Sequence, residues 1–337
     1  MPVFTARDFT LASGITLPQI EIAWESWGHL NAGRSNAILV THGLSSSHHA
    51  ADPPTLDSRI GWGHTQIGPG LIYDTDRYFV LSSNVLGSFY GSTCARSVNP
   101  ATGQTWGRDF PFVTMEDVVR AQGLLVGSLG IQRLHAVAGC SLGGFQAYQW
   151  AVTLPDNLTR IIATDTADHD SFDLAAAIPP LLARFAATPG WNDGHPAPQS
   201  MVVPLAAIRE EMLIGFGLRE KLAVTVADPV TRARMLADEA RAWAKIADPW
   251  ALVAMYRTAA SFDVRQQLDR IRVPVLTVTA DTDLWYPPAI GRAQVDRLRA
   301  AGAHVTYLEI QSALGHYATT EEPWKWAATA KAFLDAD

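Results

Sequence analysis

The sequence predicts an α/β fold in which helices flank a mostly parallel central sheet and a helical segment interrupts the alternation. Three observations support this prediction. Short apolar runs alternate with helical segments, a Gly-Cys-Ser-Leu-Gly string follows one of these runs, and residues 170–260 contain helical periods without a strand candidate of comparable strength. The chain has 337 residues, which is enough for one large core or two ordinary domains.

Six short apolar runs are the predicted strands. They are continuous rather than alternating, which is typical of strands that are covered on both faces of a parallel sheet. The runs cover residues 36–41, 78–82, 134–138, 160–164, 273–279 and 304–310.

Helical segments separate these runs. Residues 114–129 begin with a threonine and two early acids, which suit a helix N-terminus, and continue with apolar residues at helical spacing. Residues 143–154 are a second predicted helix, and residues 324–334 are a closing amphipathic helix.

Residues 170–260 break the alternation of strand and helix. Their helical periods cover residues 181–187, 204–216, 230–244 and 250–261. We therefore divide the chain into a core part at 1–169, a helical lid insertion at 170–260 and a second core part at 261–337. Insertions after the carboxyl ends of parallel strands overhang the ligand crevice, so a lid is expected. The alternative is that these helices only pack against the sheet.

Composition narrows the classes of partner. The net charge is −7, and such an acidic surface disfavours nucleic acid. No apolar run is long enough to span a bilayer, and the N-terminus lacks the basic and apolar regions of a signal peptide. The two cysteines, Cys94 and Cys140, are interpreted as free thiols. We expect a cytoplasmic protein that has neither a membrane partner nor a nucleic-acid partner.

The string from Gly139 to Gly143 matches the G-x-S-x-G pattern. It follows a predicted strand and opens a predicted helix, which is the setting of a nucleophile elbow. The turn is tight, so residues two positions from the serine must be almost free of side chain, as Gly139 and Gly143 are. The sequence thus predicts Ser141 as a nucleophile.

A serine nucleophile needs a base, and the base needs a partner that fixes its tautomer. His316 follows the last predicted strand and has the expected place in the chain order Ser, Asp, His. Two acids, Asp281 and Asp283, follow the preceding strand. We favour Asp283 as the third member, and we interpret Asp281 as a turn residue.

Acyl transfer also needs donors for the developing oxyanion. The backbone N–H of Leu142, directly after the nucleophile, is one predicted donor. The other is the N–H of Leu44 in the loop after residues 36–41, with Ser45 as the second candidate.

No H-x-x-x-H or C-x-x-C pattern and no phosphate-binding glycine motif is present, so neither a metal nor a cofactor is expected.

Long strings of the chain resemble the homoserine O-acetyltransferase-like family of the α/β-hydrolase superfamily. The resemblance extends over most of the chain and includes the three predicted catalytic residues. Its strings lie at residues 21–30, 41–51, 67–70, 74–93, 99–103, 109–111, 283–288 and 315–316. The resemblance implies an α/β-hydrolase fold.

The resemblance also implies a ping-pong reaction on a small-molecule acyl substrate. Ser141 would take an acyl group from a donor such as acetyl-CoA, as a co-substrate, and pass it to an alcohol. An arginine of the lid region would meet the carboxylate of an amino acid, and Arg209 matches it best. The alternative for Arg209 is a solvated helix arginine. The resemblance further implies a homodimer.

One position departs from the family pattern. Tyr317 follows His316, where the family usually has an acid suited to an ammonium group. A phenol cannot supply that charge at neutral pH. We therefore expect a hydrolase of a small carboxylic ester, in which Ser45, Arg209 and Tyr317 line the substrate site. The alternatives are an O-acetyltransferase that uses homoserine or a similar hydroxyl acceptor and, more remotely, a scaffold without catalysis.

Overall fold

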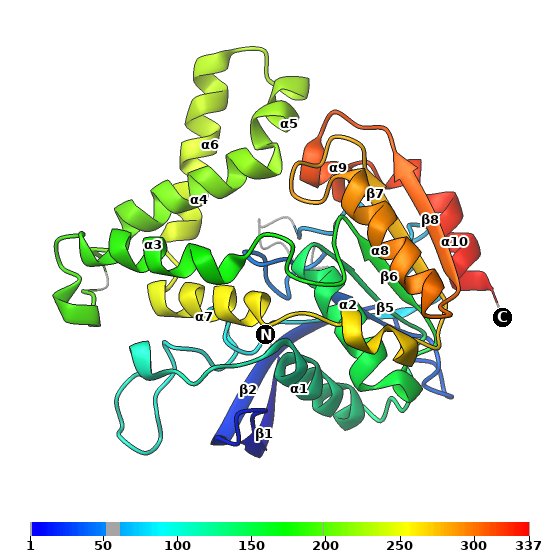
Figure 1. The fold of residues 1–337 in the computed structure, drawn as a ribbon, viewed down its shortest axis with the longest axis horizontal. Helices are drawn as coiled ribbons and strands as arrows, with labels where there is room; N and C mark the ends of the chain where they lie inside the picture. Colours follow the sequence, from blue (N-terminus) through cyan, green and yellow to red (C-terminus); the bar gives the residue numbers. More distant parts are fainter. Residues whose placement is uncertain (1, 52–60, 198, 337) are drawn as a thin grey trace.

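The structure is a computed structural model that describes residues 2–51, 61–197 and 199–336. In this part of the chain the strands form one eight-stranded sheet in the order β1-β2-β4-β3-β5-β6-β7-β8 (Figure 1). The strands are β1 (Val3–Thr10), β2 (Thr16–Trp27), β3 (Ala37–Thr41), β4 (Phe79–Ser83), β5 (Ala136–Cys140), β6 (Ile161–Thr164), β7 (Val275–Ala280) and β8 (Val305–Ile310). The predicted α/β fold is confirmed.

The six predicted strands correspond to β3–β8, which all pair in parallel. β1 and β2 were not among them, and they form an antiparallel hairpin that joins the sheet through β4. β1 is mostly exposed, whereas every residue of β3 is buried. A half-exposed strand has no continuous apolar run in its sequence. This explains why the two strands of the N-terminal hairpin were not predicted by the pattern that identified the other six.

The seven predicted helices correspond to α1, α2, α3, α4, α6, α7 and α10, although α3 begins seven residues before its predicted start, and α5, α8 and α9 were not predicted. α1 begins at a capping box in which the Thr114 side chain accepts from the Asp117 N–H. The helices are α1 (Met115–Ser128), α2 (Leu142–Thr153), α3 (Leu174–Ala186), α4 (Val202–Phe216), α5 (Leu218–Thr225), α6 (Pro229–Ala244), α7 (Pro249–Ala260), α8 (Pro288–Ala300), α9 (Ala318–Glu321) and α10 (Ala327–Asp335). In the described residues no helix is long and apolar enough to cross a membrane.

Two apolar layers cover the two faces of the sheet. Successive strand residues point to opposite faces, so neighbours in β3 join different layers. Leu39 packs in the layer that includes α1, α2 and α8, whereas Ile38 and Val40 pack in the layer that includes Trp326 and Leu334 at the α10 end of the chain. The sheet is therefore buried on both sides, and its strand ends are the places where loops can form a site.

The helices α3–α7 connect β6 to β7, and α6 extends well away from the sheet (Figure 1). Parts of α3, α4 and α7 join the main core, as Phe185 does. Residues of α4, α5 and α6 form a separate small cluster, which includes Leu213, Leu222 and Leu236. These helices therefore both pack against the core and hold a cluster of their own.

Candidate active site

Ser141 lies at the sharp turn between β5 and α2. Its backbone has φ 60° and ψ −127°, a conformation that non-glycine residues rarely adopt. A Cβ atom on Gly143 would lie 2.2 Å from the carbonyl oxygen of Thr41, so only glycine fits beside the turn. The structure thus places the predicted nucleophile on a strained strand-to-helix elbow, as the sequence motif indicates.

His316 and Asp283 form a hydrogen-bonded pair. His316 Nδ1 lies 2.8 Å from Asp283 Oδ2, and both side chains are buried. Burial disfavours the charged imidazolium, but the charge and the hydrogen bond of Asp283 outweigh it, so the pKa of His316 lies above its ordinary value. With Nδ1–H directed at Asp283, the Nε2 atom is the one left to accept a proton.

Asp281, the alternative acid, has a different role. It is exposed, and its Oδ1 accepts a hydrogen bond of 2.8 Å from the backbone N–H of Ser312. It therefore caps the loop after β8, as expected for a turn residue. Of the two acids, the structure brings Asp283 to the histidine.

The loop after β3 passes beside Ser141. A Cβ atom on Gly43 would lie 3.8 Å from the Cβ of Ser141. Leu142 is the first residue of α2, so its N–H has no acceptor within the helix. The N–H of Leu44 has no hydrogen-bond acceptor among the residues that the structure describes. Both predicted oxyanion donors are thus unused groups next to the nucleophile.

Ser45 is anchored by three side chains. Its carbonyl oxygen accepts from the hydroxyl of Tyr90 at 3.0 Å and from Nε1 of Trp243 at 3.2 Å. Its Oγ accepts from Nη1 of Arg209 at 2.6 Å. Trp243 and Arg209 belong to α6 and α4, so the inserted helices hold the loop that carries Leu44.

Arg209 is 9% exposed, which excludes the solvated helix arginine considered from the sequence. Its guanidinium lies over the ring of Trp243 at 5.4 Å and 3.9 Å from Oε1 of Glu239. The Nε atom is buried and has no hydrogen-bond partner in the described structure. A cation with an unused buried donor suits an anionic group of a ligand.

His42 holds the same loop through hydrogen bonds of its ring with the backbone. Its Nδ1 lies 2.8 Å from the carbonyl oxygen of Gly43, and the N–H of Val85 donates to its Nε2 at 3.2 Å. Burial lowers the pKa of His42 to about 4, so the ring is neutral and Nδ1 carries the proton. This histidine therefore fixes the loop.

Tyr286 is a site residue that the sequence reasoning did not single out, although it lies three residues after Asp283. Its ring stacks on His316 with centroids 5.7 Å apart. Burial raises the pKa of Tyr286 well above its ordinary value, and a hydrogen-bonding interaction with Ser141 partly opposes that shift. The phenol is thus neutral beside the nucleophile. Among the described residues, no hydrogen bond joins Ser141 to His316, whose side-chain partner is Asp283.

Tyr317 is enclosed between the histidine loop and the inserted helices. It packs against the small cluster of α4, α5 and α6, and its ring meets Phe216 edge to face at 6.4 Å. The ammonium group of Lys221 lies 4.9 Å above the Tyr317 ring and pairs with Glu321 at 2.5 Å. Burial raises the pKa of Tyr317 to about 12, so this position carries no negative charge at neutral pH.

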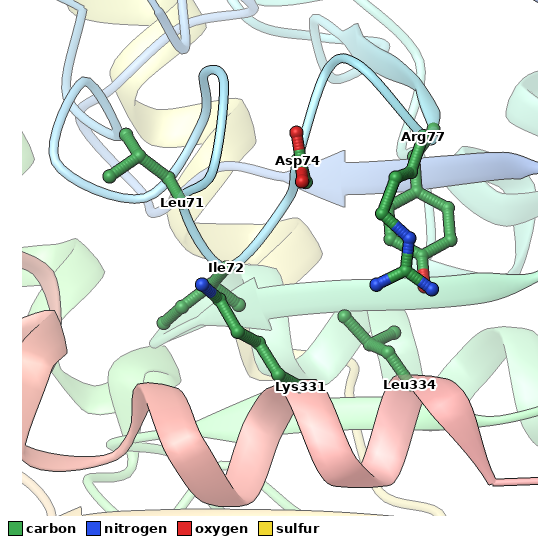
Figure 2. Close-up of a pocket in the computed structure, with 7 residues that line it drawn as sticks. Leu71, Ile72, Asp74, Arg77, Lys331 and Leu334 are labelled. Carbon is green, nitrogen blue, oxygen red and sulfur yellow. The ribbon is translucent and has the colours of Figure 1, made fainter.

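Two cavities lie elsewhere. One, of about 50 Å³, lies between residues 71–78 and α10 and is lined by Asp74, Arg77 and Lys331 among others (Figure 2). It has room for one or two water molecules only. The other, of about 530 Å³, is lined by Phe9, Arg120 and neighbouring residues of β1, α1 and α2. Neither is lined by Ser141 or His316, so neither is the predicted substrate site.

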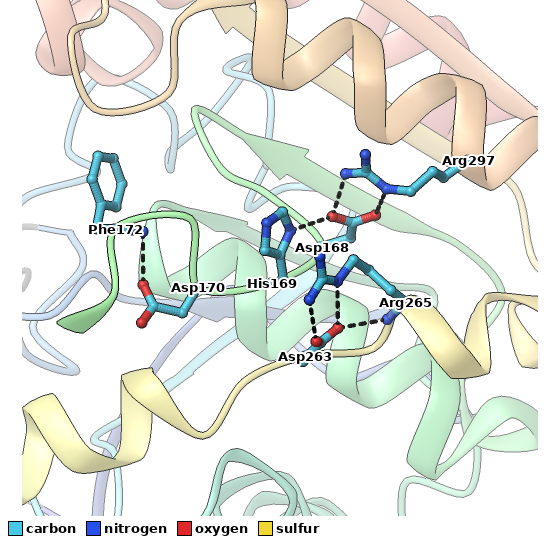
Figure 3. A network of polar contacts seen from close by, with 7 residues as sticks. All are labelled: Asp168, His169, Asp170, Phe172, Asp263, Arg265 and Arg297. Atoms are coloured by element: carbon cyan, nitrogen blue, oxygen red, sulfur yellow. Dashed lines mark hydrogen bonds and ion pairs between the residues drawn. The ribbon is translucent and has the colours of Figure 1, made fainter. Parts of the chain in front are cut away.

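A polar network joins the two ends of the helical insertion to α8 (Figure 3). Arg297 donates to both oxygens of the buried Asp168, at 2.8 and 2.7 Å. His169 Nδ1 lies 2.8 Å from Asp168 Oδ1, and an isolated β-bridge pairs His169 with Asp263. The segment that enters the insertion and the one that leaves it are therefore tied together.

The fold and the elbow are those of the α/β-hydrolase class, whose family model, described as alpha/beta hydrolase fold, matches residues 36–318. Homoserine O-acetyltransferase of Rhodospirillum rubrum is 32% identical over 350 residues, which cover 96% of this chain and 89% of the relative. The chain belongs to the homoserine O-acetyltransferase-like family of α/β hydrolases, as its sequence motifs predict.

Crystal structures named as an acetyltransferase and as an esterase are both among its structural neighbours. Homoserine O-acetyltransferase from Bacillus anthracis aligns with a TM-score of 0.90 at 26% identity, covering 100% of this chain and 97% of that one. An esterase aligns with a TM-score of 0.89 at 28% identity, covering 99% of each chain. The chain is thus an enzyme of this class, and the fold is shared by acyltransferases and esterases.

Proposed function

We propose that the protein hydrolyses small carboxylic esters through an acyl-enzyme on Ser141. His316 takes the proton of Ser141 during attack and returns it to the leaving alcohol. Asp283 keeps the imidazole in the Nδ1–H tautomer and stabilises its charged form. The N–H groups of Leu44 and Leu142 bind the oxyanion, and water, activated by His316, releases the acid.

The residues around Tyr317 are the reason why we propose water, and not an amino acid, as the acyl acceptor. At the position where the family usually places an acid, the protein has a neutral ring covered by the ammonium group of Lys221. An amino-acid acceptor would find no unpaired carboxylate for its ammonium group among the described residues around Tyr317, because Glu321 pairs with Lys221 and Glu239 faces Arg209. A neutral ester or a carboxylate-bearing ester meets no such obstacle, and Arg209 suits the carboxylate.

Acetyl transfer to homoserine or a similar hydroxyl acceptor, with acetyl-CoA as donor, is the second candidate. The names of the relatives favour it, and the buried Arg209 is compatible with the carboxylate of an amino acid. Both candidates share the first half-reaction, so they differ only in whether a bound alcohol outcompetes water at the acyl-enzyme.

The test is acyl release from p-nitrophenyl acetate with and without L-homoserine, and in parallel with acetyl-CoA as donor. We expect release that homoserine does not accelerate and no consumption of acetyl-CoA. Homoserine-dependent consumption of acetyl-CoA would establish the transferase instead.

The conservative Tyr317→Phe variant should retain the rate of ester hydrolysis within about threefold, because the phenol hydroxyl carries no charge here.

Replacing the nucleophile tests the acyl-enzyme itself. Ser141→Ala should lower kcat by about 10⁴-fold or more, because the remaining groups only bind and polarise the ester. It should also abolish labelling by a fluorophosphonate, which reacts with activated serines. Unchanged circular dichroism would show that the fold is intact. Labelling that persists in this variant, or a wild-type protein that is not labelled, would contradict the proposal, and the latter would favour a scaffold without catalysis.

A cytoplasmic location and a homodimer are also proposed. Cys94 and Cys140 are both free, which fits a reducing compartment. The dimer depends on the family resemblance alone, and light scattering of the purified protein would check it.

A further inference from the structure

A second buried carboxyl group lies beside the proposed triad. Asp165 directly follows β6, its side chain has no exposed surface, and its backbone has φ 43°. No lysine or arginine in the described residues forms an ion pair with it. Burying a carboxyl without a cation is costly, so the position of Asp165 needs another explanation.

The two oxygens of Asp165 join the segments that carry the acid and the histidine. Oδ1 accepts a hydrogen bond of 2.9 Å from the N–H of Ala280, the last residue of β7 and three residues before Asp283. Oδ2 lies 2.6 Å from Oγ1 of Thr319, three residues after His316. One side chain thus connects two loops that come from different strands.

These contacts persist whether or not Asp165 carries a proton. When the carboxyl is ionised, the Thr319 hydroxyl donates to Oδ2. When it is protonated, the carboxyl can donate a hydrogen bond to Thr319 Oγ1. The Thr319 hydroxyl can then donate its own hydrogen bond to Thr164 Oγ1, which lies 3.3 Å away. Burial raises the pKa of Asp165 to about 7, and the charge of Asp283 acts in the same direction.

From this geometry we propose that Asp165 is a positioning residue: it ties the segments of Asp283 and His316 together, and its charge state tunes the basicity of His316. The inference rests on the proposed triad. The titratable groups around Asp165 are Asp283, His316 and Cys140. A negative charge on Asp165 favours protonated His316 and disfavours the thiolate of Cys140.

Asp165→Asn tests the proposal, because the amide has the same shape, can accept from Ala280 and can donate to Thr319, but cannot ionise. We expect the acid limb of the pH profile of kcat/KM for p-nitrophenyl acetate to shift down by about one unit. Asp168→Asn is the matched control, since it removes a buried carboxylate three residues along the same segment. It should lower Tm without moving the limb. An unshifted limb in Asp165→Asn, or an equal shift in Asp168→Asn, would overturn the proposal.

A second measurement does not require the variant to fold. In the wild-type protein, the ¹³C resonance of the Asp165 carboxyl should titrate above about pH 5, where ordinary aspartates have finished. The imidazole ¹⁵N resonances of His316 should show an inflection at the same pH. A carboxyl resonance that stays constant above that pH would refute the tuning. Since these resonances do not depend on turnover, they also separate a failure of this proposal from a failure of Ser141 as the nucleophile.

Discussion

Asp281 and Asp283 lie two residues apart, but their carboxylates have different partners. Asp283 meets His316, whereas Asp281 caps Ser312 at the surface. Asp283→Asn should lower kcat about 10⁴-fold, because the amide no longer holds the productive tautomer of the histidine. Asp281→Asn should change kcat less than threefold or so, since it removes one exposed capping bond. Steady-state kinetics on p-nitrophenyl acetate compares the two, and equal losses would contradict the assignment.

The elevated pKa of His316 predicts two pH effects. Activity should fall as the pH drops below that pKa, which lies above 6.5, because a protonated imidazole cannot act as a base. The group also binds a proton more tightly in the folded than in the unfolded protein. Its contribution to stability is therefore complete below pH 6.5 and is lost as the pH rises through the folded pKa.

Urea denaturation between pH 6 and 9 checks the second effect, with His316→Gln as the control. The difference in unfolding free energy between wild type and variant should shrink as the pH rises across this range, roughly the span over which the imidazole loses its proton. A difference that grows with pH would contradict the raised pKa.

At the scale of elements, the tight contact between β3 and α2 decides the shape of the elbow. Gly143→Ala would place a methyl group 2.2 Å from the backbone of Thr41, which cannot move without disturbing β3. We expect a loss of about 1–3 kcal/mol in unfolding free energy and a larger loss of activity. Gly127→Ala, on the exposed side of α1 with no atom nearby, should instead stabilise the protein by about 0.5–1 kcal/mol. Thermal denaturation of both variants provides the measurement.

The sequence predicted the elements near the site well because their signals are local. β5 and its glycine-flanked serine are contiguous, and Asp283 and His316 each follow a continuous apolar run. Asp165 also follows such a run, but its role was not predicted, because it depends, like the roles of Tyr90 and Trp243, on which segments the fold brings together. The same reason explains Tyr286, whose ring stacks on a histidine 30 positions away.

At the scale of the whole molecule, the ion pair between the buried Asp168 and the partly exposed Arg297 joins the helical insertion to α8. In the part of the chain that the structure describes, Arg297→Leu would leave His169 as the one side chain hydrogen-bonded to the buried Asp168, and we expect a loss of about 3 kcal/mol or more in unfolding free energy. Arg292→Leu on the same helix removes an exposed pair with Glu309 and should cost less than about 1 kcal/mol. Denaturant titrations would compare them. Similar losses would show that the Asp168 network has no special role in stability.

The division into core and lid remains a prediction at this scale. The sequence predicted the helices of residues 170–260 from their periodicity, but periodicity says nothing about what a helix touches. Phe185 packs in the main core, whereas Leu222 belongs to the separate cluster. The insertion is therefore not a uniform layer.

The anchoring of Ser45 by Trp243 and Arg209 has a consequence for how such enzymes diversify. Substrate preference is often thought to change by exchanging an inserted domain as a module. Here such a transplant would remove two of the three described side chains that hydrogen-bond to Ser45 and would leave Tyr90 and the contact of His42 with Gly43 to hold the loop. The inserted helices and the 42–45 loop must therefore evolve as one unit, and a grafted insertion would need matching residues at both places to give a working catalyst.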